Sequence, residues 1–308
     1  MILAAGLTPA WQQIMRFDAL RPGEVNRAQQ VHWCASGKVL NVALALAHLE
    51  AECTLLSPLG GLSGQAIDRE FAERSITRRW IAVERPTRVC TTILDQHARQ
   101  TTELVENAGA LSAAELRQFA DAFAELSATA QLAVFSGSLP EGTPSEYLAG
   151  LVASARCPLV LDVRGPELLA VLASRPLVVK PNREELSRTV GVDLSDDAAL
   201  LRAMRDLNVR GAQWVVISSG AQATWASSLQ GCYRFRPSPV PVVNPIGSGD
   251  CLCAGLAVGL AQGLPPREAI RLGMAAAAEN VTHWLPARVA LPAVRRRIDA
   301  VAVDEVGV

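Results

Sequence analysis

The chain has 308 residues, and 29 lysines and arginines against 30 aspartates and glutamates give it a formal net charge of −1. This balance argues against a nucleic-acid-binding protein, which normally carries a clear basic excess. Half of the residues are apolar and 19% are charged, so intrinsic disorder is excluded and a large core is expected. Only Lys38 and Lys180 are lysines, and the other 27 basic residues are arginines.

Two segments of the first third, about 12–34 and 88–105, mix polar and apolar residues in strand-like alternation. They do not fit the strand–helix rhythm of the rest of the chain, so we expect them to form a small β-strand lid outside the main sheet. Between them, a helix is expected to begin near Lys38 and to continue to about Leu49.

From residue 112 onward, short apolar runs alternate with segments of helical periodicity. The expected helices are 112–126, 144–155 and 197–208, and the expected strands are 132–135, 159–163, 177–179 and 214–217. Ser112 and Glu115 have the spacing of a capping box at the first of these helices. This order predicts a doubly wound α/β fold with a mainly parallel sheet and helices on both faces.

The last third has a different pattern. Residues 222–228 and 232–236 are expected to form an antiparallel hairpin, followed by helices over 247–262, 265–284 and 291–301. No repeat or linker-like stretch divides the chain. We therefore expect one domain over 1–308, with the lid as part of it.

The seven cysteines have neither disulfide-like nor zinc-like spacing, which favours reduced thiols in a cytosolic protein. The N-terminus lacks the basic and apolar regions of a signal peptide, and the apolar runs are too short for a membrane helix. We expect a cytoplasmic protein without nucleic-acid or membrane partners.

A loop segment with two glycines around a serine, Asn244 to Asp250, leads into the helix expected over 247–262. Such a loop can turn several N–H groups toward one anion, such as a phosphate, at the positive end of a helix. Asp250 would repel that anion unless it serves as a general base that takes a proton from an attacking hydroxyl. The alternative is an ordinary turn followed by an aspartate that the helix dipole favours.

Lys38 stands at the start of its expected helix, where the dipole disfavours a cation. An anionic partner, such as a substrate phosphate, would account for it; the alternative is an exposed lysine. Asn182 and Glu185 follow an expected strand and share one helix face. They could hold a hydrated Mg²⁺, or they could form a capping box that needs no metal.

In this order, the segments resemble the ribokinase-like (PfkB) carbohydrate kinases, closest to the branch with 1-phosphofructokinase and tagatose-6-phosphate kinase. The resemblance runs nearly the full length and implies the doubly wound α/β fold with a β lid. The segments that carry it are Leu7–Trp11, Arg21–Arg27, Ser36–Ala43 (similar to G-G-K-G-x-N-V-A), Ser136–Pro140, Lys180–Glu185 (K-P-N-x-x-E), Ser218–Ala221 (similar to S-x-G-A) and Gly247–Asp250 (similar to G-A-G-D).

The resemblance implies a role for each matching residue, and ATP and Mg²⁺ as cofactors. Asp250 would be the catalytic base, with an anion hole formed by Gly247, Ser248, Gly249 and Asp250. The sugar and its phosphate would bind Gln12, Gly37, Lys38, Asn41, Arg88 and Ser138. The nucleotide would bind Lys180, Asn182, Ser218 and Gly220, and Mg²⁺ would be held through water by Asn182 and Glu185.

Four positions depart from the family pattern. Gln12 replaces an aspartate that holds sugar hydroxyls, and Val39 replaces a glycine, which would put a branched side chain where backbone approaches the sugar. Asn244-Pro245 replaces Ser-Thr before the phosphate loop, and Ala223 replaces a glycine of the nucleotide loop. These changes bear on the identity of the sugar and on the catalytic rate.

We expect an ATP-dependent kinase that transfers the γ-phosphoryl group to a hydroxyl of a phosphorylated ketohexose of the fructose-1-phosphate or tagatose-6-phosphate type. The alternatives are a kinase for an unphosphorylated sugar or nucleoside, and a weakly active sensor that binds a sugar phosphate. An exposed lid strand would also allow a homodimer to form through the lid.

Overall fold

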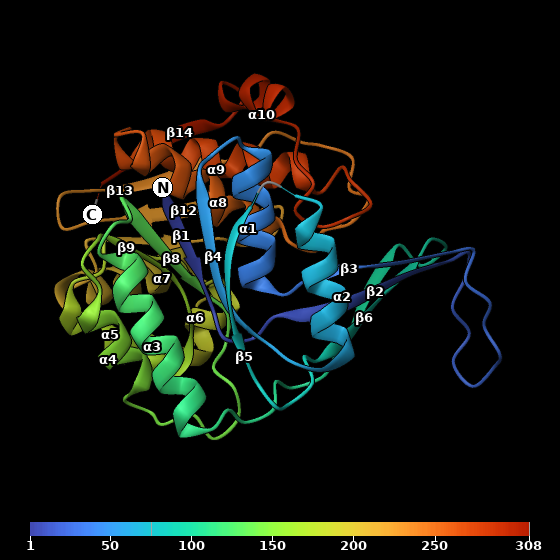
Figure 1. Ribbon diagram of the computed structural model, residues 1–308. Helices are drawn as coiled ribbons and strands as arrows, with labels where there is room; N and C mark the ends of the chain where they lie inside the picture. Colours follow the sequence, from blue (N-terminus) through green and yellow to red (C-terminus); the bar gives the residue numbers. More distant parts are fainter. Residues whose placement is uncertain (75, 308) are drawn as a thin grey trace.

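The main sheet has ten strands in the order β14-β13-β12-β11-β10-β9-β8-β1-β4-β5, in a computed structural model that describes residues 1–74 and 76–307 (Figure 1). The bounds in this order are Ala302–Val306, Cys232–Arg236, Thr224–Ser227, Trp214–Ile217, Val178–Val179, Leu159–Asp162, Leu132–Ser136, Ile2–Ala5, Cys53–Leu59 and Thr77–Ala82.

Seven neighbouring strands, from β11 through β10, β9, β8, β1 and β4 to β5, pair in parallel. Strands β12, β13 and β14 extend the sheet beyond β11, and each pairs antiparallel with its neighbour. Side chains of β1 alternate between two cores: Ile2 and Ala4 join one cluster, and Leu3 and Ala5 join the other. A strand that is apolar on both faces must be covered on both sides. The predicted α/β fold, with a mainly parallel sheet between two helical layers, is confirmed.

Ten α-helices surround this sheet within the described residues. They are α1 (Lys38–His48), α2 (Gly61–Ala72), α3 (Ala113–Ser127), α4 (Tyr147–Ser154), α5 (Gly165–Val171), α6 (Arg183–Val190), α7 (Asp197–Val209), α8 (Ser248–Ala261), α9 (Pro266–Asn280) and α10 (Leu291–Ile298). Residues of α1 and α8 belong to one core, and residues of α3 and α7 belong to the other. Helices α8 and α9 approach closely because Gly255 faces Gly273, where an added Cβ would lie 2.7 Å from the Gly273 Cα.

The predicted elements differ from the structure mainly at their ends. The capping box of Ser112 and Glu115 begins α3 as expected, and the predicted hairpin is β12 and β13. The helix expected from residue 265 to 284 ends at Asn280, and the one expected to reach Val301 ends at Ile298. The sequence after α10 turns back as β14 and pairs with β13, which the periodicity did not predict.

A second sheet, which we call the lid sheet, has the order β3-β2-β6-β7. Its strands are β3 (Gln30–Ser36), β2 (Ala10–Phe17), β6 (Val89–Asp95) and β7 (Gln100–Val105). They match the two segments expected to form the lid, except that β2 begins at Ala10 and β3 ends at Ser36, each outside the expected bounds 12–34. The sheet projects from one side of the main sheet (Figure 1). Its buried face includes Gln12, Ile14, Cys90, Thr92 and Leu94, so one side of the lid sheet packs inward and the other faces outward.

Three features meet at one edge of the main sheet: the carboxyl ends of β8, β9 and β10, the start of α8, and the inward face of the lid sheet. This edge is where open parallel sheets bind ligands. Among the described residues, no helix has both the length and the apolar character needed to span a bilayer.

Candidate active site

A cavity of ≈ 460 Å³ opens between the lid sheet and the carboxyl ends of the central strands, and its volume suits a small-molecule ligand. Thirteen of the residues expected from the sequence line it: Gln12, Gly37, Lys38, Asn41, Arg88, Ser138, Lys180, Asn182, Glu185, Ser218, Gly247, Ser248 and Gly249. Asp250 completes this group. Gly220 does not line this cavity; it lies exposed in the turn after β11, with a φ of 53°.

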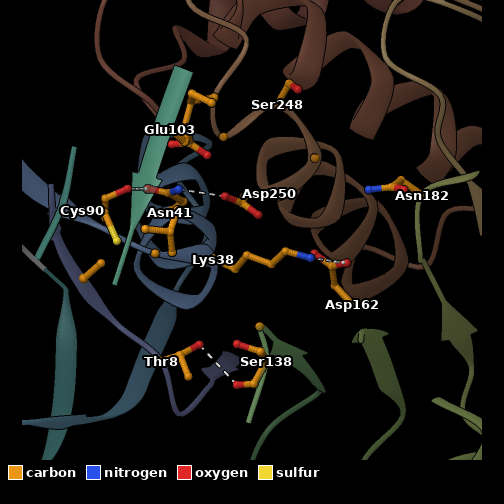
Figure 2. Close-up of a pocket in the computed structure, with 18 of the residues that line it drawn as sticks. Thr8, Lys38, Asn41, Cys90, Glu103, Ser138, Asp162, Asn182, Ser248 and Asp250 are labelled. Atoms are coloured by element: carbon orange, nitrogen blue, oxygen red, sulfur yellow. Dashed lines mark hydrogen bonds and ion pairs between the residues drawn. The ribbon is translucent and has the colours of Figure 1, made fainter. Parts of the chain in front are cut away.

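Both lysines of the chain contact one aspartate, Asp162, the last residue of β9. Figure 2 shows Lys38 directed at this carboxylate. Oδ1 of Asp162 lies 3.3 Å from Nζ of Lys38 and 3.4 Å from Nζ of Lys180. The hydroxyl of Ser136, at the end of the neighbouring strand β8, donates to Oδ2 over 3.2 Å. Parallel strands thus bring together residues from four separate parts of the sequence.

Burial and charge act in opposite directions on these three groups. Burial alone would raise the pKa of Asp162, but the two ammonium groups hold it below its ordinary value. Burial would lower the pKa of Lys180, but the negative charge of Asp162 outweighs the effect of burial, so the pKa of Lys180 is raised. The same balance raises the pKa of Lys38, whose ammonium faces Asp162, Glu185 and Asp250. All three groups are therefore charged near neutral pH.

Asp250 lies in the first turn of α8, and its side chain faces the cavity (Figure 2). The amide of Asn41 donates to Oδ2 of Asp250 over 2.7 Å, and Ser36 donates to Oδ1 of Asn41 over 3.3 Å. Burial, together with the negative charge of Asp162, raises the pKa of Asp250 to about 6. A carboxylate held in this way can accept a proton near neutral pH.

Two buried asparagines fix the loop before Asp250. Oδ1 of Asn244 accepts from the N–H of Ile246, while Asn280 donates to the carbonyl of Ile246 over 2.8 Å. Gly247 has a φ of 80°, and a Cβ there would lie 2.9 Å from Cβ of Pro286. The first N–H groups of α8 have no partner inside the helix, and Gly247, Ser248 and Gly249 line the cavity. The N–H of Ser248 donates to the carbonyl of Pro245 over 3.3 Å.

Comparison with known proteins agrees with this geometry. Residues 7–290 match the family described as pfkB family carbohydrate kinase. The chain belongs to the pfkB family of carbohydrate kinases. Its fold is similar to Escherichia coli phosphofructokinase-2, with a TM-score of 0.89, 25% identity, and 97% of this chain and 98% of that chain covered.

Two further solved structures are similar to this pfkB-family chain. One is phosphofructokinase-2 from Escherichia coli in complex with fructose-6-phosphate, with a TM-score of 0.88, 26% identity, and 97% of this chain and 99% of that chain covered. The other is a possible 1-phosphofructokinase from Thermotoga maritima, with a TM-score of 0.90, 22% identity and full coverage of both chains. The protein is therefore a sugar or phosphosugar kinase.

Kinases of this kind use a nucleotide and commonly Mg²⁺, and the carboxylates of this pfkB-family kinase suit such an ion. Oε2 of Glu185 accepts from the N–H of Asn182, and Oδ1 of Asn182 accepts from the N–H of Glu185, so both residues form the capping box of α6. Oε1 of Glu185 instead lies 3.3 Å from Nζ of Lys38, on the cavity side next to Asp162. Glu185 thus caps the helix with Oε2, while its Oε1 pairs with Lys38. Asp162 and Glu185 are the carboxylates that would hold Mg²⁺.

Arg88 lines the cavity but already makes three hydrogen bonds to backbone carbonyls. Its guanidinium donates to the carbonyls of Thr8, Pro9 and Glu106 at 3.0, 3.3 and 3.1 Å. These bonds join the segment before β2 to the segment after β7. A guanidinium has five N–H groups, so two remain for a ligand.

The expectation for Val39 was wrong. Its side chain is 1% exposed, belongs to the core on the α1 side, and packs toward Gly6, where an added Cβ would lie 2.7 Å from Cβ of Val39. The helix start turns this side chain away from the cavity and into the core. Gln12, by contrast, is buried in the lid sheet and lines the cavity.

Three charged residues of the cavity were not identified from the sequence: Asp162, Glu103 and Arg164. For Asp162 a signal existed, since an aspartate directly after a buried strand lies at the carboxyl edge of a parallel sheet. Glu103 is one polar residue in the fully exposed strand β7, and nothing local distinguishes it. Arg164 lies 3.9 Å from Glu185 across the cavity edge, and its position depends on the turn after β9.

Proposed function

We propose that this protein is an ATP-dependent kinase that phosphorylates a hydroxyl of a phosphorylated ketohexose of the fructose-1-phosphate or tagatose-6-phosphate type. The observation that carries this proposal is Asp250, which faces the cavity beside the N–H groups of the loop at residues 247–249. The pairing of a base with an anion-binding helix start suits phosphoryl transfer to an alcohol.

In this proposal, Asp250 takes the proton of the acceptor hydroxyl as its oxygen bonds to the γ-phosphorus. The bond from the γ-phosphorus to the bridging oxygen breaks, and ADP leaves with that oxygen. The loop N–H groups stabilise the charge that collects on the transferred group. Asn41 holds the carboxylate of Asp250 by its bond to Oδ2, which leaves Oδ1 to receive the proton.

The nucleotide and metal would bind along the other side of the cavity. Asp162 and Glu185 supply carboxylate oxygens, while Asn182 and Ser218 lie at the adjoining strand ends and are joined by a β-bridge. Mg²⁺ bound there would neutralise phosphate charge. Lys180 carries a further positive charge next to Gly249, because a Cβ added at Gly249 would lie 3.8 Å from Nζ of Lys180.

One observation favours a second candidate, a kinase for an unphosphorylated sugar. The ammonium of Lys38 already contacts Asp162 and Glu185, and the guanidinium of Arg88 binds three carbonyls. A sugar phosphate would have to draw Lys38 away from two carboxylates or use the remaining N–H groups of Arg88. A neutral sugar would need neither change.

We also propose that two copies of the chain associate through the outer face of the lid sheet. A row of side chains crosses this face from Trp33 through Gln13 and Thr91 to Leu104. Trp33 is 43% exposed and stacks on Trp11, and Leu104 is 56% exposed. Apolar side chains on a projecting sheet are typical of a contact surface.

The role of Asp250 predicts a particular dependence of rate on pH. With a pKa of about 6, Asp250 is protonated below this pH and cannot accept a proton, so kcat/KM for the best acceptor should fall as the pH drops through 6. Asp250→Asn should lower kcat by about 10²–10⁴-fold and should remove this acid limb. Asp193→Asn, an exposed control, should behave as the wild type. Full activity of Asp250→Asn would refute the assignment.

A panel of acceptors separates the two candidate functions. We expect a coupled ADP-release assay to give the highest kcat/KM with fructose 1-phosphate, fructose 6-phosphate or tagatose 6-phosphate, above fructose, tagatose and ribose. Lys38→Met should raise KM for the sugar phosphate sharply. Lys38→Arg should also impair binding, although the charge is kept, because a wide planar guanidinium replaces a compact ammonium. Higher kcat/KM with an unphosphorylated sugar would select the second candidate.

Light scattering after gel filtration tests the proposed dimer. The wild type should elute with twice the mass of one chain, and Trp33→Glu should elute as a monomer because it places a charge in the apolar row. Val209→Glu provides a matched control, since Val209 is 68% exposed on α7, outside the lid sheet. A monomeric wild type, or a dimer that persists in Trp33→Glu, would contradict the proposal.

A further inference from the structure

Glu103 lines the cavity from the lid sheet, although every residue of its strand β7, Glu103 included, is exposed to solvent. In the β6–β7 register it stands directly opposite Thr92, and Val105 stands opposite Cys90. Side chains at directly opposed positions share one face of a sheet. Ala10, Gln12, Cys90, Glu103 and Val105 line the cavity, so they form its lid-side wall.

A chain of two hydrogen bonds crosses three strands of this wall. Nε2 of Gln12 donates to Oγ1 of Thr92 over 2.6 Å, and Oγ1 of Thr92 donates to Oε1 of Glu103 over 3.1 Å. Thr92 is fully buried, so its single hydroxyl proton is committed to Glu103. The chain of bonds has one direction, and it fixes the orientation of the Gln12 amide, with its nitrogen toward Thr92.

The consequence is a wall that presents acceptors. With its nitrogen bonded to Thr92, Gln12 keeps its amide oxygen for other partners. Among the described residues, no hydrogen bond engages Oε2 of Glu103, and no cation forms an ion pair with its carboxylate. A ligand at this wall must therefore supply donors, and hydroxyl groups are the donors that a sugar offers.

We propose that Glu103 recognises the sugar: its free carboxylate oxygen accepts a hydrogen bond from a hydroxyl of the acceptor, and Thr92 and Gln12 hold it in position. This inference rests on the proposed function, since it assumes a sugar in this cavity. The negative charge that the family pattern places at position 12 is here supplied from β7, one strand beyond β6.

The same wall disfavours the other ligands of the reaction. A phosphate near Glu103 would be repelled by its carboxylate, so the sugar's phosphate must point elsewhere, toward the cationic side chains of the cavity. A metal ion is also disfavoured at this wall, because Glu103 is the one carboxylate among the five lid-side residues that line the cavity. Glu103 thus sets the orientation of the acceptor as well as its affinity.

The experiment compares Glu103→Gln with Glu305→Gln, which removes the same charge from an exposed position on the edge strand β14. The acceptor is the panel compound with the highest kcat/KM. Glu103→Gln should raise its KM by about tenfold to a hundredfold, as expected for the loss of a hydrogen bond to a charged group, with KM for ATP unchanged and kcat much less affected. Glu305→Gln should match the wild type.

Two further measurements separate recognition from a structural role. Calorimetric titration with the same acceptor, in the absence of nucleotide, should show the same loss of affinity. Inhibition by inorganic phosphate should not weaken in Glu103→Gln, because phosphate does not use this wall. Thr92→Val removes the relay hydroxyl but keeps the side-chain shape and the charge of Glu103, and it should raise the acceptor KM by a smaller factor.

The outcomes distinguish this inference from the proposed function. A wild type that phosphorylates a sugar, together with a Glu103→Gln variant that matches Glu305→Gln, overturns the role of Glu103 and leaves the kinase assignment intact. Loss of phosphate inhibition in step with acceptor binding would also overturn it, since the variant would then have damaged the whole cavity. A wild type that acts on no sugar or sugar phosphate refutes the proposed function itself.

Discussion

The site depends on one buried carboxylate, that of Asp162, and on the two ammonium groups that hold it. A charge that is 2% exposed is costly unless it is paired and hydrogen-bonded, and Asp162 has Lys38, Lys180 and Ser136 as partners. With Glu185 and Asp250, the cluster contains three carboxylates and two ammonium groups. The excess of negative charge suits a divalent cation, and it is one reason that the pKa of Asp250 is raised. The contact of both lysines with one oxygen of Asp162 also explains the choice of lysine in an arginine-rich chain. Two wide guanidinium groups would not fit around a single carboxylate oxygen as two compact ammonium groups do.

The fold brings these charges together because every contributing residue lies at the end of an element. Ser136 and Asp162 end parallel strands, Lys180 follows another, and Lys38 and Asp250 begin helices. Close approach of backbone segments then completes the cavity. Gly37 has a φ of 88°, and a Cβ there would lie 2.9 Å from the carbonyl oxygen of Thr8, so only glycine allows α1 to begin against the segment before β2. The lid sheet adds neutral and acidic acceptors from the opposite side.

Much of the main sheet could be predicted from the sequence because its strands are short, continuous apolar runs; the run at 214–217 coincides with β11. The site was harder to predict. Local spacing could not decide between a capping box and a metal site at Asn182 and Glu185. The Glu185 carboxylate forms the capping box with Oε2, and its other oxygen, Oε1, lies on the cavity side. The partner of Lys38 could not be predicted either, since Asp162 is 124 positions away in the sequence. Glu103 depends on the β6–β7 register, which a single sequence does not specify.

The chain's composition makes the central claim directly measurable, because a protein labelled with ¹³C at lysine Cε gives only two side-chain signals. If Asp162 holds both ammonium groups, both signals titrate above the ordinary lysine pKa of 10.5, and Asp162→Asn lowers both values. The buried Lys180 should respond more strongly, because it loses its only ion-pair partner among the described residues, whereas Lys38 keeps Glu185. A wild-type signal that titrates at or below 10.5 would contradict the account, because one of the two lysines would then lack the paired charge on which the rest of the site depends.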